Sequence, residues 1–163
     1  MAIIPIRTLP DPVLRQKAKK IHGLDPSISK LIKDMIETRD EASGVGLAAP
    51  QIGVSLRLVV IRLPGEEDEE IILINPEIVK KSGEREVDER CLSIPGYVGK
   101  VKRAGSVVVK GRNENWKEVR IKADELLAQA LEHEIDHLNG CLYVDLLESP
   151  EKLTKLEAVK TEA

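Results

Sequence analysis

The residues best suited to chemistry lie near the C-terminal end, where His133 and His137 are four positions apart and Glu134 follows the first histidine. Residues four apart share one face of a helix, so two imidazoles with this spacing can bind one metal ion. The neighbouring glutamate can then act on a water molecule at that ion. The pattern H-E-x-x-H therefore indicates metal-assisted hydrolysis. The competing interpretation is a solvated helix face that is rich in charge.

A catalytic site of this kind needs a third protein ligand. His22 lies in a loop beside Gly23, where a histidine is usually solvated. Cys141 follows His137 by four residues, but Gly140 is expected to end the helix first, which favours a small buried apolar role for Cys141. Cys91 stands at a strand end before a Pro-Gly turn, where it is either a ligand or a core residue. Spacing alone does not choose between Cys91 and Cys141.

The elements that must position these residues can be inferred from periodicity. A one-faced amphipathic helix is expected from Pro26 to Glu41, and a second helix from Asp124, its N-cap, to a stop at Gly140. A last charged helix is expected from Ser149. Further segments predict strands, with a hairpin around Ser82-Gly83, and these are residues 56–63, 71–74, 78–81, 84–87, 97–101, 106–110 and 117–121.

This order of elements predicts an α+β fold. Antiparallel sheets should pack around the helix that carries H-E-x-x-H in the C-terminal half, with the amphipathic helix on the N-terminal side. A length of 163 residues, without a repeat or a long linker, suits a single domain over 1–163.

Composition excludes several classes of partner. The net charge of −3 and an aromatic content of 2% argue against nucleic-acid binding. No apolar run approaches the length of a membrane span, and the N-terminus lacks the features of a signal or transit peptide. We therefore expect a cytoplasmic protein without a membrane partner, in which both cysteines are free for packing or for a metal.

Three segments together resemble the peptide deformylase family, in the family's order and over nearly the whole chain. Residues 44–51 (GVGLAAPQ) match its Gly-rich segment, residues 89–93 (ERCLS) match its E-G-C-L-S segment, and residues 133–137 (HEIDH) match its H-E-x-D-H helix. Two positions depart from the pattern. Arg90 replaces the usual Gly and is expected to alter the rim of the substrate groove, and Glu132 stands where Gln is common.

The resemblance implies a bacterial-type hydrolase that removes the formyl group from N-formylmethionine at the start of new polypeptides and releases formate. It implies Cys91, His133 and His137 as ligands of one Fe²⁺, with Zn²⁺ as the alternative that the softness of the donors also suits. It assigns proton transfer to Glu134 and oxyanion stabilisation to the Gln51 side chain and the Leu92 backbone N–H. For Gln51, the other interpretation is a loop side chain that faces water.

The methionine side chain of such a substrate needs an apolar pocket. Ala130, Gln129 and Leu126 precede His133 by three, four and seven residues and share its helix face. Val45, Gly46 and Val87 are expected to complete the pocket. Core packing is the competing interpretation for the larger apolar members. The pocket candidates are Val45, Gly46, Val87, Leu126, Gln129 and Ala130. Nascent formylated chains are the expected partners, with transient ribosome contact, for which the charged tail 151–160 is a candidate unless it is simply a solvated helix.

Overall fold

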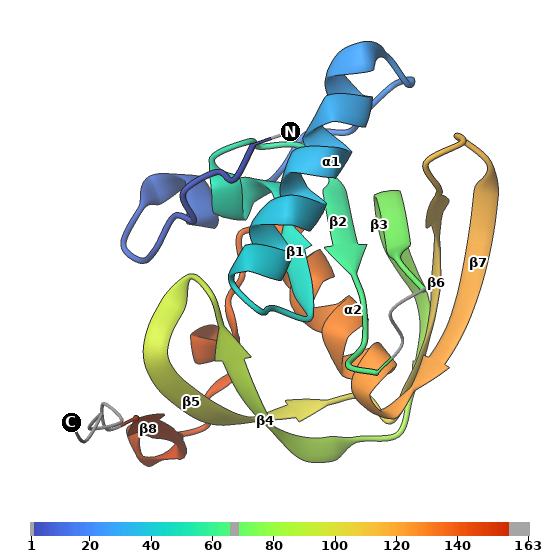
Figure 1. Ribbon diagram of the computed structural model, residues 1–163. Helices are drawn as coiled ribbons and strands as arrows, with labels where there is room; N and C mark the ends of the chain where they lie inside the picture. The colour runs from blue at the N-terminus through green and yellow to red at the C-terminus, as the bar shows by residue number, and fades with distance from the viewer. Residues whose placement is uncertain (1, 66–68, 157–163) are drawn as a thin grey trace.

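The computed structural model describes residues 2–65 and 69–156. It is an α+β structure with two antiparallel sheets and two α-helices (Figure 1). The first sheet has five strands, in the order β1 (Gly46–Ala48), β2 (Leu58–Ile61), β3 (Ile71–Ser82), β6 (Ser106–Arg112) and β7 (Glu118–Asp124). The second sheet has three strands, in the order β4 (Arg85–Cys91), β5 (Ile94–Arg103) and β8 (Leu153–Lys155).

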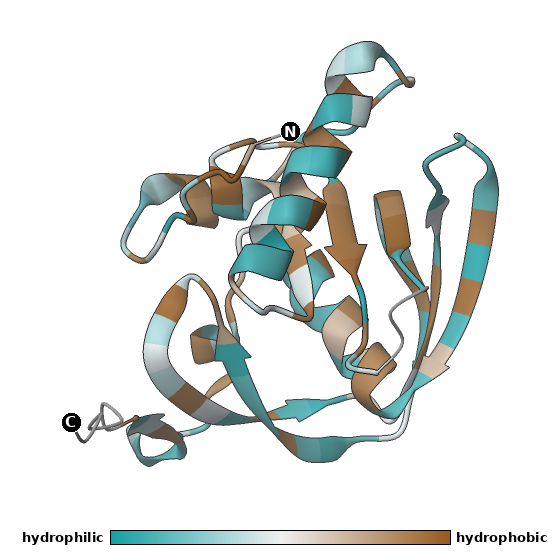
Figure 2. Ribbon diagram, viewed as in Figure 1, coloured by the Kyte–Doolittle hydropathy of each residue, from teal (hydrophilic) through white to brown (hydrophobic). Residues whose placement is uncertain are grey.

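The first sheet lies between the two helices, α1 (Pro26–Glu41) and α2 (Glu125–Leu138). Alternate residues of a strand point to opposite faces of a sheet. On β2, Leu58 and Val60 pack in the cluster that contains the apolar face of α1, whereas Val59 and Ile61 pack against α2. This explains why β2 is apolar at every position, while β7, which has one exposed face, alternates in hydropathy (Figure 2).

Local chemistry sets the ends of both helices. Asp25 caps α1 by accepting a hydrogen bond from the backbone N–H of Ile28 at 3.1 Å, and Pro26 occupies the first turn. After α2, Gly140 adopts a left-handed conformation with φ of 77°, and a Cβ there would lie 2.5 Å from the carbonyl oxygen of Arg15. Only glycine fits such a position without strain, so α2 ends where the sequence predicted.

Four short 3₁₀ segments complete the described fold: η1 (Pro12–Arg15), η2 (Ala49–Ile52), η3 (Tyr143–Leu146) and η4 (Pro150–Lys152). A third core cluster, which includes Leu14, Val101 and Tyr143, joins η1 and η3 to the second sheet. In residues 2–65 and 69–156, neither α-helix combines the length and apolarity needed to cross a membrane.

Two predictions about the strands and helices are wrong. The segments on either side of Ser82-Gly83 do not form a hairpin with each other, because β3 pairs with β2 and β6 whereas β4 pairs with β5. The chain changes sheets at this turn. The last helix expected from Ser149 is instead η4 followed by β8, because residues 153–155 pair with the edge of β5. The rest of the predicted tail, from residue 157, lies outside the described residues, as does part of the acidic loop before β3.

Candidate metal centre

Three side chains from two elements bring their ligand atoms together. His133 and His137 lie one turn apart on α2, and Cys91 is the last residue of β4. Cys91 Sγ lies 3.3 Å from His137 Nε2, which lies 3.3 Å from His133 Nε2. All three atoms lie within 4.8 Å of one another, so a single metal ion could bind to all of them. Placing them requires β4 to end against the face of α2.

The other two ligand candidates lie elsewhere. Cys141 is exposed, because the chain turns at Gly140 and leaves the histidine face. The small buried role predicted for Cys141 is therefore wrong, although the reasoning that removed it from the ligand set agrees with the geometry. His22 is exposed in the loop before α1. Neither residue belongs to the group of converging ligand atoms.

A chain of buried ionic groups holds His133 in place on the side of its ring that is opposite the ligand atom. His133 Nδ1 lies 2.6 Å from Glu89 Oε1, and both oxygens of Glu89 accept hydrogen bonds from Arg103, at 2.5 and 2.7 Å. Arg103 also donates to Asp136 at 2.6 Å. Burial alone would raise the pKa of Glu89, but the hydrogen bonds from Arg103 and His133 lower it to about 2. An ionised Glu89 keeps the proton of His133 on Nδ1, which leaves Nε2 free to bind a metal.

Negative charge collects around the point where the three ligand atoms meet. Burial opposes protonation of His133, but the hydrogen bonds with Cys91 and Glu89 and the negative charge of Glu134 raise its pKa well above the usual value. This local field favours a cation. Burial lowers the pKa of His137 well below its usual value, so its imidazole is neutral, as a metal ligand must be. The donor set and the field together fit a divalent metal ion.

Glu134 points into the same site without a fixed partner. Its side chain is buried, and Oε1 has no hydrogen-bond partner among the described residues. Burial raises the pKa of Glu134 to about 7, where a carboxylate can both accept and donate a proton near neutral pH. A Cβ at Gly46 would lie 2.6 Å from Glu134 Oε2, so Gly46 is needed to give this carboxylate room. Gly44 makes similar room for Leu92, whose Cδ1 would lie 2.8 Å from a Cβ there.

The amide of Gln51 is held in one orientation beside the ligands. Its Oε1 accepts a hydrogen bond from the Ala48 backbone N–H at 2.9 Å, which directs Nε2 towards Ser93 Oγ at 3.1 Å and Cys91 Sγ at 3.7 Å. Gln51 is 1% exposed, so it is not a loop side chain that faces water. The NH₂ group is therefore held beside the metal ligands, with its two N–H groups directed at Ser93 and Cys91.

A cavity of about 480 Å³ opens onto these groups. His133, Glu134, Gln51, Cys91 and Leu92 line it, together with five of the six predicted pocket residues, which are Val45, Gly46, Leu126, Gln129 and Ala130. The sixth, Val87, does not line the cavity and packs against the third core cluster instead.

Sequence reasoning did not identify the residues that support the site. Ser93, Arg103 and the role of Glu89 were missed, although Glu89 and Ser93 lie within the quoted segment ERCLS. A buried ion pair between β4 and β5 leaves no local pattern, because its partners are 14 residues apart. Arg90 is exposed at the cavity and is not among the residues with positive φ, so its replacement of glycine causes no backbone strain.

Comparisons with known proteins agree on one family. The family model for polypeptide deformylase matches residues 3–153. A peptide deformylase of Dehalococcoides mccartyi (strain CBDB1) is 57% identical over 156 residues, which cover 96% of this chain and 93% of the relative. One from Halothermothrix orenii is 52% identical over 145 residues, which cover 89% and 94% of the two chains.

Solved structures show the same likeness in three dimensions. The crystal structure of a peptide deformylase from Legionella pneumophila matches with a TM-score of 0.89 and 51% identity, and covers 92% of this chain and 88% of that one. The enzyme from Synechococcus elongatus, solved in complex with actinonin, matches with a TM-score of 0.87 and 41% identity over 91% and 81% of the two chains. The chain belongs to the polypeptide deformylase family.

Proposed function

We propose that the site between α2, β4 and η2 removes the formyl group from N-formylmethionine at the start of newly made polypeptides and releases formate. Members of the family are metallohydrolases that act on N-formyl peptides. The observation that carries the assignment to this site is the meeting of Cys91, His133 and His137 beside the unpaired carboxylate of Glu134. Residues 1–163 would act as one catalytic domain.

Cys91, His133 and His137 would hold the metal ion. When bound, the ion supplies the Lewis acidity that makes water nucleophilic near neutral pH. We propose Fe²⁺ as the native ion, with Zn²⁺ as the alternative. One thiolate and two imidazoles accept either metal, so the donor set supports both.

Glu134 would move the proton. Its carboxylate takes a proton from the attacking water and delivers it to the departing amine of the methionine. A pKa of about 7, which results from burial, suits a group that must serve as base and then as acid in one turnover. Gly46 supports this role by leaving space for the carboxylate at the cavity wall.

Gln51 and Leu92 would stabilise the oxygen of the formyl group as it gains negative charge. The Gln51 NH₂ group is preoriented by the hydrogen bond that the Ala48 N–H donates to Oε1, and it would exchange its bond to Ser93 or Cys91 for one to this oxygen. Leu92 lies in the turn between β4 and β5 and lines the same cavity, where its backbone N–H would be the second donor. Such donors act most strongly in a buried site, where the local dielectric constant is low.

The substrate methionine would occupy the apolar part of the cavity. Val45, Leu126 and Ala130 offer apolar surface, and Gly46 and Gln129 border it. Nascent formylated chains exist where translation takes place, so we place the enzyme in the bacterial cytoplasm. Its contact with the ribosome would be transient.

Formate release from a formyl-Met-Ala-Ser peptide is the direct test. The metal-loaded protein should release formate, and a chelator should abolish the release until Fe²⁺ is restored. The same peptide without the formyl group is the control. Cleavage of its peptide bonds, with no formate from the formylated form, would instead identify a metallopeptidase.

A further inference from the structure

Arg90 adds a positive charge to the edge of the cavity. It is exposed and lines the cavity, whereas its neighbours Glu89 and Cys91 are buried on the metal side of β4. Successive strand residues point to opposite faces, so the Arg90 side chain belongs to the outer face of β4. The Cys91 thiol, which is a proposed metal ligand, and the Arg90 guanidinium therefore lie on opposite faces of one strand.

The other charged residues on this outer face have partners of their own. Asp88 pairs with Lys100 at 3.0 Å, and Glu86 pairs with Lys152 at 3.3 Å. Over residues 2–65 and 69–156, Arg90 makes no ion pair. Within the part of the chain that the structure describes, Arg90 is therefore a cation without an ion-pair partner, at the end of β4 closest to the metal site.

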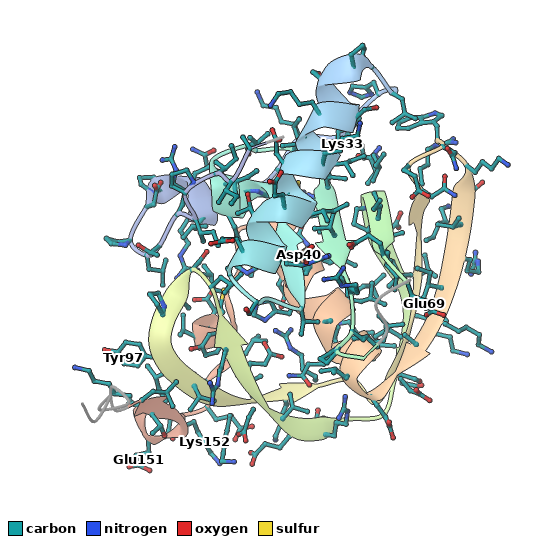
Figure 3. The ribbon with its side chains drawn as sticks, viewed as in Figure 1. Lys33, Asp40, Glu69, Tyr97, Glu151 and Lys152 are labelled. Atoms are coloured by element: carbon teal, nitrogen blue, oxygen red, sulfur yellow. The ribbon has the colours of Figure 1, made fainter. Side chains whose placement is uncertain are left out.

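The strand opposite Arg90 leaves space beside it. β4 pairs with β5 up to Glu89 and Gly99, and then the register shifts so that Cys91 pairs with Ile94. Residues 95–98 therefore have no partner on β4, and Pro95, Gly96 and Tyr97 line the cavity there. Figure 3 shows Tyr97 on the side of the molecule where Glu151 and Lys152 lead into β8 along β5. The cavity thus extends from the metal ligands to the surroundings of Arg90.

The topology indicates how a peptide would meet Arg90. β4 is an edge strand, so its free edge can pair with an extended peptide. With the formylmethionine side chain on the inner face, near His133, the next side chain points to the outer face. That second side chain is then the cross-strand neighbour of the outward residues of β4, at a distance where opposite charges attract and like charges repel.

We infer that Arg90 selects substrates with an acidic residue directly after the formylmethionine. The inference rests on the proposed function and specifies its substrate class, namely formyl-Met-Asp and formyl-Met-Glu peptides. Arg90 acts on the bound peptide through charge alone and takes no part in the reaction. Because the contact is solvent-exposed, salt weakens the preference.

The test compares kcat/KM for formyl-Met-Asp-Ser and formyl-Met-Lys-Ser peptides, with formyl-Met-Ala-Ser as the neutral reference. The ratio of the Asp to the Lys value should exceed one, and should fall roughly fivefold in Arg90→Gln, because each exposed contact contributes roughly two- to fivefold. Arg90→Lys should keep most of the preference, and Arg90→Glu should reverse it. Raising the ionic strength should bring the wild-type ratio towards one.

Arg120→Gln is the matched control, since Arg120 is an exposed strand arginine on β7 that does not line the cavity. Its ratio should equal that of the wild type. Formate release from all three peptides with a ratio that is the same in wild type and Arg90→Gln would overturn the inference and leave the proposed function standing. Failure to release formate even from the neutral peptide would overturn the proposed function itself.

Discussion

Two clusters of charged groups, one around Arg39 and one around His133, are built in opposite ways. Around Arg39, which is fully buried near the end of α1, each polar group has a partner: Glu70 and Asp40 accept its hydrogen bonds, and Arg62 adds a second cation on Asp40 at 2.7 Å. Around His133, the side of the cluster that faces away from the cavity is equally well paired through Glu89 and Arg103. The side that faces the cavity is not, because Glu134 Oε1 has no partner among the described residues.

The difference separates a structural cluster from a site that is prepared for a ligand. A buried polar atom without a hydrogen bond costs about 1–3 kcal/mol, so a cluster that serves only stability should leave none. The His133 cluster accepts this cost on the side that faces the cavity. Substitutions in the Arg39 cluster should therefore lower the free energy of unfolding. Substitutions on the cavity side of the metal centre should instead abolish metal binding or turnover and leave the protein folded.

The largest effect is expected when a ligand is removed. Cys91→Ala should weaken metal binding by roughly a hundredfold or more, since even residues that only orient a ligand contribute ten- to a hundredfold. Cys141→Ala is the matched control and should keep its metal, because Cys141 is exposed and outside the ligand group. Metal content after purification, measured for both variants, checks this. The opposite ranking would show that the ligand set is wrong.

Glu134→Gln should keep the metal and lose turnover by roughly a hundredfold to ten-thousandfold, the usual contribution of a proton-transferring group. The amide has nearly the same shape as the carboxylate, so the space beside Gly46 stays filled and the fold should persist. Formate release at matched metal occupancy is the measurement, with urea unfolding alongside it. Near-normal turnover in the metal-loaded variant would remove Glu134 from the mechanism.

Gln51→Leu should lower kcat roughly a hundredfold or more and change KM much less, because an oxyanion donor acts mainly in the transition state. Leucine is close to glutamine in size, so η2 should remain packed and the metal should remain bound. Steady-state kinetics on a formyl-Met peptide can separate the two parameters. A change in KM alone would make Gln51 a substrate-binding residue, and oxyanion stabilisation would then depend on Leu92.

The smallest effect on activity is expected in the paired cluster. Arg39→Met should lower the free energy of unfolding by about 3 kcal/mol, the lower end for breaking a buried ion pair, because Glu70 and Asp40 can still reach water. Arg62→Met removes a partly exposed partner of the same Asp40 and should cost less than about 1 kcal/mol. Urea unfolding measures both. Loss of bound metal from folded Arg39→Met would contradict the separation between the two clusters.

Local patterns predicted well where the cause is local. The end of α2 follows from the left-handed Gly140, and α1 occupies the residues indicated by its apolar spacing. Asp124 stands at the N-cap position of α2 as predicted, but its side chain makes no capping hydrogen bond. The hairpin around Ser82-Gly83 failed because a turn signal shows that the chain reverses but not which strands then pair. Strand β8 was missed because its three residues are extended only through pairing with β5.

The sequence by itself determined that two imidazoles and a carboxylate share one helix face, since helical spacing fixes that relation within a single turn. It also determined the family, through three short segments in order. The same resemblance favoured Cys91 over Cys141 as the third ligand, which spacing alone did not. Only the tertiary structure brought Cys91 to the two histidines, packed Val87 against the third core cluster, and joined Glu89 to Arg103 behind His133. Those relations depend on which strands pair and how they pack against α2, and such long-range contacts have no fixed spacing along the chain.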